Sequence, residues 1–394
     1  MTTSKRLDGI GEYYFSQKLR EIDELNKQGK NIINLGIGSP DLPPHPDVIR
    51  VLQEESAKPN VHAYQSYKGS LVLRKAIADW YKTWYGVDLN PDTEILPLIG
   101  SKEGIMHICM TYLNEGDAAL VPNPGYPTYR SAVKLAGGVC LDYDLKEEHN
   151  WLPDFAALEQ QVKAYEAGAG GGKVKLMWVN YPHMPTGKLG DKSLFEKLVA
   201  FGKAQGILIC HDNPYSFILN ENPSSLLSVP GAMDVALELN SLSKSQNMAG
   251  WRVGSLAGSK QRIDEVLRFK SNMDSGMFLP VQLAAAKALS LGKDWYDSVN
   301  AVYRERREKV VELLNLLECS FDPAQVGMFM WAKIPVRGAA NGFELSDKVL
   351  YGANVFITPG GIFGQAGDGY IRVSLCSTVE KLEESIRRIR NAEL

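Results

Sequence analysis

The sequence predicts an α/β protein in which a large domain with a mostly parallel sheet, covered by helices on both faces, is joined to a smaller α+β domain from both chain ends. Short apolar runs alternate with amphipathic segments through the middle of the chain. Near-continuous apolar strands between helices are typical of parallel strands buried on both faces. Beyond residue 280 the pattern changes to long helices and alternating strands. At 394 residues the chain is long enough for two to three average domains.

Four apolar runs in the middle of the chain predict strands of the large sheet. They are Ala118 to Pro122, Val174 to Val179, Gly206 to Cys210 and Val235 to Leu239. Between the second and third runs, residues 192–205 carry apolar side chains at helical spacing. The Gly-rich patch at 168–173 lacks the GxxxxGK[ST] pattern of a phosphate loop, so we interpret it as a flexible connection. We expect the large domain to span residues 51–289.

The two ends of the chain predict the second domain. One long helical stretch covers residues 281–317, alternating segments follow at 328–334 and 370–375, and a last helix covers 379–391. The amphipathic segment from Tyr14 to Gln28 predicts a helix that joins them. We therefore assign residues 1–50 and 290–394 to the small domain.

Composition excludes several classes of function. Lys and Arg total 43 and Asp and Glu total 46, so a net charge of -3 gives no reason to expect nucleic acid or an acidic membrane as a partner. No apolar run approaches the roughly 20 residues of a membrane span. The five cysteines form no CxxC pair and the six histidines no HxxxH pair, so we expect no metal site. Reduced thiols and the lack of a signal-peptide pattern predict a cytoplasmic protein.

Polar residues follow each of the predicted strands. Tyr126 follows the first strand, and a Pro-Thr-Gly loop follows the second. Asp212 and Tyr215 follow the third strand, and a Ser-rich segment that ends at Lys244 follows the fourth. Taken singly, these are ordinary turn and capping residues. Ligands of open α/β sheets bind beyond the carboxyl ends of the strands, so their convergence on one edge favours a functional site.

The segment Ser241-Leu242-Ser243-Lys244, followed by Gly250-Trp251-Arg252-Val253-Gly254, resembles the SxSK and GxRxG motifs of the class I and II aminotransferases. These are fold-type I pyridoxal-phosphate enzymes, and the resemblance runs from Asn34 to Leu375. It implies pyridoxal 5'-phosphate as cofactor. Lys244 is implied to form the Schiff base with the cofactor aldehyde and to move the proton between the substrate Cα and the cofactor C4′. Such an amine needs a depressed pKa. Asp212 then pairs with the pyridine nitrogen, and Tyr215 donates to the phenolic oxygen.

The resemblance also implies a phosphate site. Gly100 to Gly104 opens an amphipathic helix, whose first amides suit a phosphate. The residues implied as phosphate ligands are Ser101, Lys102, Ser241, Ser243 and Arg252, while Tyr126 is implied to stack on the cofactor ring. Tyr64 matches a tyrosine that the family sends into the neighbouring subunit, which implies a homodimer with shared active sites. The segment from Asn272 to Phe278 resembles a second segment that contributes to the active site of the neighbouring subunit.

The substrate is implied to be held by its α-carboxylate. Arg372, in an alternating strand, matches the arginine whose guanidinium fork binds that group, and Gly38 matches the glycine whose backbone touches it. Tyr13, Tyr14 and Phe15 are expected either at the substrate entrance or in the core. No arginine that would read a substrate side chain is identifiable.

One position departs from the family. An asparagine normally precedes the Pro-Thr-Gly segment and donates a hydrogen bond to the phenolic oxygen of the cofactor, but here the residue is Met184. A thioether cannot donate. His183 is one substitute donor to consider.

The resemblance implies a ping-pong transamination between an L-amino acid and a 2-oxo acid. The alternative within the scaffold is a lyase, such as one acting by carbon–sulfur β-elimination. A transcription regulator with an aminotransferase-like domain would need a basic DNA-binding module, and only about 30 residues precede Leu35. A non-catalytic descendant would be expected to lack Lys244 or Asp212, and both are present.

Overall fold

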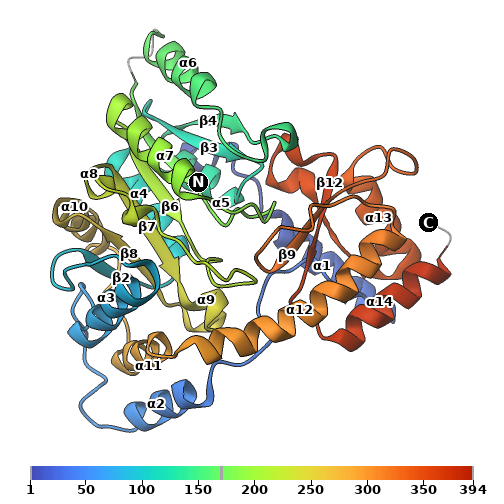
Figure 1. The fold of residues 1–394 in the computed structure, drawn as a ribbon, viewed down its shortest axis with the longest axis horizontal. Coiled ribbons are helices and arrows are strands. Elements are labelled where there is room, and N and C mark those ends of the chain that lie inside the picture. Colours follow the sequence, from blue (N-terminus) through green and yellow to red (C-terminus); the bar gives the residue numbers. More distant parts are fainter. Residues whose placement is uncertain (1, 169–171, 393–394) are drawn as a thin grey trace.

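A seven-stranded sheet forms the centre of the larger part of the molecule, and the computed structural model describes residues 2–168 and 172–392 (Figure 1). In spatial order the strands are β2 (Ile95–Leu98), β8 (Gly254–Gly258), β7 (Ala236–Ser241), β6 (Leu208–Asp212), β5 (Val174–Val179), β3 (Ala118–Asn123) and β4 (Val139–Asp144). Only β8 runs antiparallel to its neighbours. The prediction of a mostly parallel sheet is therefore confirmed.

Helices cover both faces of this sheet. Those of the larger part are α2 (Pro46–Ser56), α3 (Leu71–Tyr85), α4 (Ser101–Tyr112), α5 (Pro127–Leu135), α6 (Phe155–Glu166), α7 (Lys192–Gln205), α8 (Ala232–Val235), α9 (Leu242–Ser245), α10 (Lys260–Lys270) and α11 (Leu279–Leu289). Apolar side chains of α4, α5 and α10 pack on one face, and those of α3, α6 and α7 pack on the other. Successive strand residues point to opposite faces, so each strand contributes to both cores.

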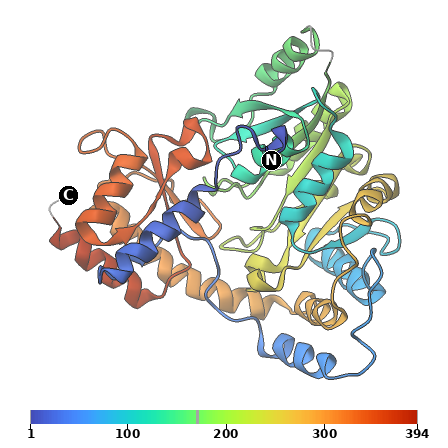
Figure 2. The ribbon, with the colours of Figure 1, turned by 180° about the vertical axis from the view of Figure 1, so that it is seen from behind.

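The smaller part joins the two ends of the chain. Its elements are α1 (Tyr14–Lys27), β1 (Ile33–Asn34), β9 (Phe329–Lys333), α13 (Gly342–Ala353), β10 (Val355–Phe356), β11 (Thr358–Pro359), β12 (Tyr370–Ser374) and α14 (Val379–Asn391). Strands β11, β12 and β9 form an antiparallel sheet, and β1 pairs with β10. The 24-residue helix α12 (Lys293–Leu316) runs from the larger part to the smaller one (Figures 1 and 2). The exact domain boundaries stay a prediction.

Three of the expected elements do not match the structure as predicted or cannot be compared with it in full. The predicted helix over 281–317 is wrong as one element, because α11 ends at Leu289 and α12 begins at Lys293, with Gly292 at its N-cap. The third predicted strand lies two residues further along, so His211 and Asp212 belong to β6 itself. Of the predicted connection at 168–173, residues 169–171 lie outside the described part. Among the described helices, none combines the length and the hydropathy of a membrane span.

Candidate active site

A cavity of about 360 Å³ opens at the carboxyl ends of the parallel strands, and residues of the smaller part such as Phe329 and Arg372 complete its lining. Eleven residues implicated by the sequence line it: Gly38, Ser101, Lys102, Tyr126, Asp212, Tyr215, Ser241, Ser243, Lys244, Arg252 and Arg372. They come from segments spread over more than 330 positions of the chain. Of the residues that the resemblance implies as catalytic, cofactor-binding or substrate-binding, only Tyr64 is absent from this lining.

Lys244 lies on the short helix α9, directly after β7. Its Nζ donates a hydrogen bond to the carbonyl oxygen of Gly38, at 2.7 Å. Burial lowers the pKa of Lys244 to about 8, with smaller opposing effects from surrounding charges. A substantial fraction of the amine is therefore unprotonated near pH 8, as a nucleophilic lysine requires.

Asp212 ends β6 on the face that packs against α5. Its Oδ2 accepts a hydrogen bond from the hydroxyl of Tyr129 at 2.8 Å, while Oδ1 is buried without a partner. Burial raises the pKa of Asp212 to about 6, and the Tyr129 hydrogen bond acts in the opposite direction. An unpartnered carboxylate oxygen in a buried site suits a cationic N–H donor. Sequence reasoning missed Tyr129, although it lies three residues after Tyr126.

The first turn of α4 and the α9 segment form a cationic pocket with several hydroxyl groups. Arg252 Nη1 lies 3.4 Å from Ser243 Oγ and donates to the Ala249 carbonyl oxygen at 2.8 Å. Its guanidinium occupies the space that a side chain at Gly100 would fill, and Gly100 has a φ of 85°. Burial and the charge of Arg252 lower the pKa of Lys102. A helix N-terminus with two cations and hydroxyls suits a phosphate.

Arg372 points from β12 into an aromatic enclosure and is only 4% exposed. Its guanidinium carbon lies 3.9 Å from the ring centroid of Phe329 and 4.7 Å from that of Phe363. Nη2 donates to the Gly36 carbonyl oxygen at 2.7 Å, and Nε has no partner. Burial lowers the pKa of Arg372 to about 10, so the side chain stays charged at neutral pH. The structure therefore holds a buried cation ready for an anionic ligand.

Met184 also lines the cavity, beside Arg372. Its Sδ lies 3.3 Å from Arg372 Nη1, and its backbone amide donates to Asn180 Oδ1 at 2.8 Å. His183 is not among the residues that line the cavity, and its Nδ1 is paired with Thr186 Oγ1 at 2.8 Å. Burial lowers the pKa of His183 to about 3, which keeps the ring neutral. The hypothesis that His183 supplies the missing donor is therefore not supported by this geometry.

The segment containing Tyr64 lies away from the cavity. The Tyr64 side chain is 91% exposed, and His62 stacks on Phe278 with ring centroids 5.9 Å apart. A side chain at Gly276 would collide with the backbone of Gln65, so residues 62–69 and 272–278 lie side by side. The role of Tyr64 in a neighbouring subunit stays a prediction.

The N-terminal aromatic residues divide between two locations. Tyr13 and Phe15 line the cavity. Tyr14 instead packs edge-on against Phe343 of α13, with ring centroids 6.1 Å apart. The expectation of an aromatic entrance therefore fits two of the three residues.

One group of potential metal ligands occurs among the described residues, formed by Glu103, His107 and Asp274. Two of the three carry hydrogen bonds already: Glu103 accepts from the Ile99 amide at 2.8 Å, and Asp274 from Lys270 Nζ at 2.8 Å. The buried ammonium beside Asp274 supplies positive charge where a metal ion would otherwise do so. We assign no metal to this group.

The family model for class I and II aminotransferases matches residues 30–389. This chain belongs to that family. It is 40% identical over 395 residues to an LL-diaminopimelate aminotransferase of Dehalococcoides mccartyi, covering 99% of each chain. A protein of the same name from Aquifex aeolicus is 39% identical, again covering 99% of both.

Solved structures agree with this assignment. The apo structure of BacF from Bacillus subtilis superposes with a TM-score of 0.91 at 36% identity, covering 99% of this chain and 98% of that one. A probable N-succinyldiaminopimelate aminotransferase from Thermus thermophilus has a TM-score of 0.85 at 31% identity, covering 94% of this chain and 99% of that one. The chain is therefore an aminotransferase that depends on pyridoxal phosphate, and the lyase alternative is not favoured.

Proposed function

We propose that the cavity binds pyridoxal phosphate with Lys244 at its aldehyde, Asp212 at its ring nitrogen and the α4 N-terminus at its phosphate, and that Arg372 holds the substrate. Three groups in one cavity carry this proposal: an amine with a lowered pKa, a buried carboxylate with one oxygen that has no partner, and a buried guanidinium whose Nε has no partner. Tyr215, Tyr126, Ser101, Lys102, Ser241, Ser243 and Arg252 complete the proposed cofactor site.

The cofactor, when bound, supplies an aldehyde that condenses with amines and an electron-withdrawing ring that stabilises negative charge at the substrate Cα. In this proposal the residues of the chain supply orientation and proton transfer. Arg372 fixes the α-carboxylate through two of its nitrogens, which fixes the direction of the Cα–H bond. Lys244 takes the α-proton as a base, and a pKa near 8 suits that role at neutral pH. Asp212 stays ionised and pairs with the ring nitrogen.

We further propose LL-diaminopimelate as the amino donor. Full-length relatives bearing that name reach 38–40% identity. The far end of this molecule carries a second carboxylate, and four cations line the described cavity: Lys102, Lys244, Arg252 and Arg372. All four have proposed roles at the cofactor or the α-carboxylate, and Lys102 is the one nearest the N-terminal aromatic residues of the cavity. Lys102, whose Nζ lies 5.2 Å from the Tyr13 ring centroid, is the cation we assign to the far carboxylate, in addition to its predicted place near the phosphate.

A second candidate donor is an amino acid with a large apolar side chain. The specific observation in its favour is the apolar wall formed by Phe15, Ile37, Met184, Phe329 and Phe363. Such a wall gains from burying an apolar side chain and offers little to a charged one.

An amino-donor panel separates these candidates. LL-diaminopimelate, lysine, phenylalanine, leucine and alanine would each be tested with 2-oxoglutarate, measuring kcat/KM. We expect LL-diaminopimelate to exceed lysine by about tenfold or more, because a charge-assisted hydrogen bond contributes about 1.5–3 kcal/mol. Lys102→Met should remove that preference, with activity on alanine as the matched control and the visible band as the check on cofactor retention. Preference for phenylalanine or leucine would favour the second candidate.

We propose that the active unit is a homodimer. Tyr64, Tyr67, Met273 and Phe278 expose between 42% and 91% of their surface on two adjoining segments. An exposed apolar group of this kind is typical of an interface between subunits. All five cysteines are free, which suits a reducing compartment, and we propose the cytoplasm as its location.

A further inference from the structure

A buried arginine in the middle of α12 joins two segments that reach the cavity. Arg306 is 3% exposed, and its guanidinium forms two parallel hydrogen bonds with the Asp41 carboxylate, at 2.7 Å and 2.8 Å. Its Nη1 also donates to the Leu375 carbonyl oxygen at 3.1 Å. The chain between β1 and α2, which contains Asp41, lies against α12 at this point (Figures 1 and 2). One guanidinium therefore connects that chain with the end of β12.

The first of these segments carries Gly38 into the cavity. Two residues before Gly38, the Gly36 carbonyl oxygen accepts a hydrogen bond from Arg372 Nη2 at 2.7 Å. Three residues after it, the Asp41 carboxylate accepts from Arg306. The backbone at Gly38 therefore lies between two anchors, and each of these anchors is a guanidinium group.

The second segment continues from the strand that carries Arg372. Leu375 directly follows β12 and lies three residues after Arg372. Its amide donates to the Met328 carbonyl oxygen at 3.0 Å, and its carbonyl oxygen accepts from Arg306. Arg306 is thus bonded to both segments of the proposed α-carboxylate site, at positions three residues beyond Gly38 and three residues beyond Arg372.

The pairing of Arg306 with Asp41 is directional. A buried ion pair is often no more stabilising than apolar residues of the same volume, because the charges lose hydration. Two parallel bonds between a planar guanidinium and a carboxylate, in contrast, fix the distance and the orientation of the two groups. The Asp41 side chain is 30% exposed, so its carboxylate retains access to water and does not depend on Arg306 for solvation. Geometry, more than net stability, is what this pair provides.

We propose that Arg306 and Asp41 are positioning residues for the substrate α-carboxylate, and that their ion pair sets the place of Gly38 relative to Arg372 before the substrate binds. Neither Arg306 nor Asp41 lines the cavity, so they act through the two segments and not by direct contact with the substrate. Binding groups that are already in place spare the substrate the cost of ordering them. The inference rests on the proposed roles of Gly38 and Arg372.

The kinetic test compares Asp41→Asn with the wild-type holoenzyme. The substitution keeps the shape of the side chain but removes the charge and one of the two acceptor oxygens that Arg306 uses. We expect KM for the amino acid and for the oxo acid to rise by about 10- to 100-fold, since a displacement of about 1 Å at a distant position costs up to about 100-fold. The visible band and kcat should be unchanged. A primary amine without a carboxylate is the control substrate, and its slow reaction should be unaffected.

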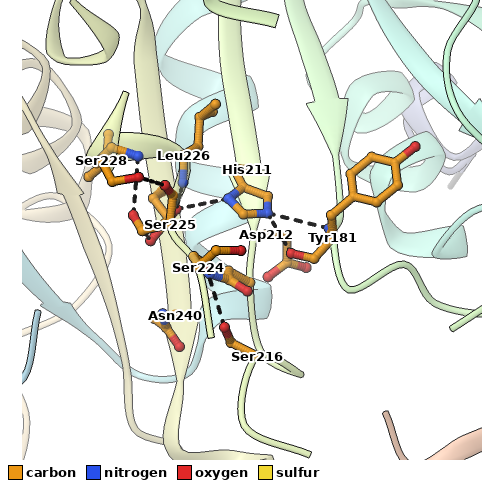
Figure 3. A network of polar contacts seen from close by, with 12 residues as sticks. Tyr181, His211, Asp212, Ser216, Ser224, Ser225, Leu226, Ser228 and Asn240 are labelled. Atoms are coloured by element: carbon orange, nitrogen blue, oxygen red, sulfur yellow. Dashed lines mark hydrogen bonds and ion pairs between the residues drawn. The ribbon is translucent and has the colours of Figure 1, made fainter. Parts of the chain in front are cut away.

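Ser225→Ala is the matched control for a general loss of stability. The Ser225 hydroxyl is buried and donates to the Glu238 carboxylate at 2.8 Å, within the polar network of Figure 3, and neither residue lines the cavity. This variant also removes one hydrogen bond to a carboxylate, so it should lower the midpoint of thermal unfolding but leave KM unchanged. A rise in KM equal to that of Asp41→Asn would mean that any loss of stability impairs substrate binding, and would overturn the inference.

Hydrogen exchange of the substrate-free holoenzyme measures the two segments themselves. In Asp41→Asn the amides of residues 36–41 and 372–377 should exchange faster by about tenfold or more, because one charge-assisted hydrogen bond no longer holds them. The first turn of α4 should exchange as in the wild type. Arg306→Lys keeps the charge but not the paired bonds, so it should change the same peptides. The double variant should lose no more than the more affected single variant, since both substitutions break one interaction.

An unchanged KM in folded Asp41→Asn, or an equal loss with the primary amine, would overturn the inference, and this variant decides the question even where Arg306→Lys fails to fold. Arg372→Lys separates this failure from that of the proposed function. If Arg372→Lys raises KM and Asp41→Asn does not, the inference alone is wrong. If Arg372→Lys leaves KM unchanged, the proposed substrate site is wrong and the inference is overturned with it.

Discussion

Replacing Arg372 with lysine keeps the positive charge and removes the two-pronged geometry of the guanidinium. In the structure, Nη2 is bonded to the Gly36 carbonyl oxygen, Nη1 contacts a thioether and Nε has no partner. A substrate carboxylate can take two parallel bonds from this group, but only one from a lysine ammonium. Losing one charge-assisted hydrogen bond costs about 1.5–3 kcal/mol, or about 10- to 150-fold in affinity.

The assay is steady-state transamination at pH 8, where Arg372 remains charged because burial lowers its pKa only to about 10. We expect KM for both the amino acid and the oxo acid to rise by that factor in Arg372→Lys, with the visible band of the bound cofactor unchanged. A primary amine without a carboxylate is the control substrate, and its slow reaction should be unaffected. Equal losses for substrates with and without the carboxylate would refute the assignment.

Three further predictions concern the same site. Met184→Asn restores a hydrogen-bond donor to the cofactor's phenolic oxygen and stabilises its anion. The pH midpoint of the visible band should therefore fall, on the order of one unit. An unmoved midpoint means that a water already donates to the phenolic oxygen. Tyr64→Phe should weaken cofactor retention by about tenfold in a dimer, through one lost hydrogen bond to phosphate; unchanged retention together with monomeric elution would contradict the shared site. The rate at which pyridoxal phosphate rebinds to the cofactor-free chain should rise with pH, with a midpoint near the Lys244 pKa of about 8, since the unprotonated amine reacts; a rate independent of pH between 7 and 9 would argue against this.

Residues near one another in the chain were the most predictable. The strand Val174–Val179 and the helix Lys192–Gln205 have the bounds that their apolar patterns predicted, because local periodicity determines both. The helix over 281–317 was predicted as one element because its composition is helical throughout. The chain turns at Ser290 to Gly292, where α11 packs on α2 and α3 while α12 packs on α14, and such packing partners are not visible in the local pattern.

In the site, too, the residues of local motifs could be predicted, whereas the contacts between distant segments could not. Eleven of the residues implicated by the motifs meet in one cavity, because each follows a strand that ends at the same edge or belongs to the smaller part facing it. The contacts between distant segments could not be predicted. Met184 Sδ and Arg372 Nη1 lie 3.3 Å apart, although the two residues are 188 positions apart in the chain. Tyr129 belongs to none of the motifs, and its contact with Asp212 depends on how α5 packs against β6.

The covalent attachment point of the cofactor tests the central claim most directly. Borohydride treatment of the yellow holoenzyme fixes the cofactor to the lysine that holds it, and peptide mass spectrometry then locates the added mass. The buried amine of Lys244, with its pKa lowered to about 8, predicts a single modified peptide containing Lys244. The mass should be absent from Lys244→Ala treated in the same way. Modification at Lys102 or at another lysine, with Lys244 unmodified, would contradict the assignment of Lys244 as the residue that holds the cofactor.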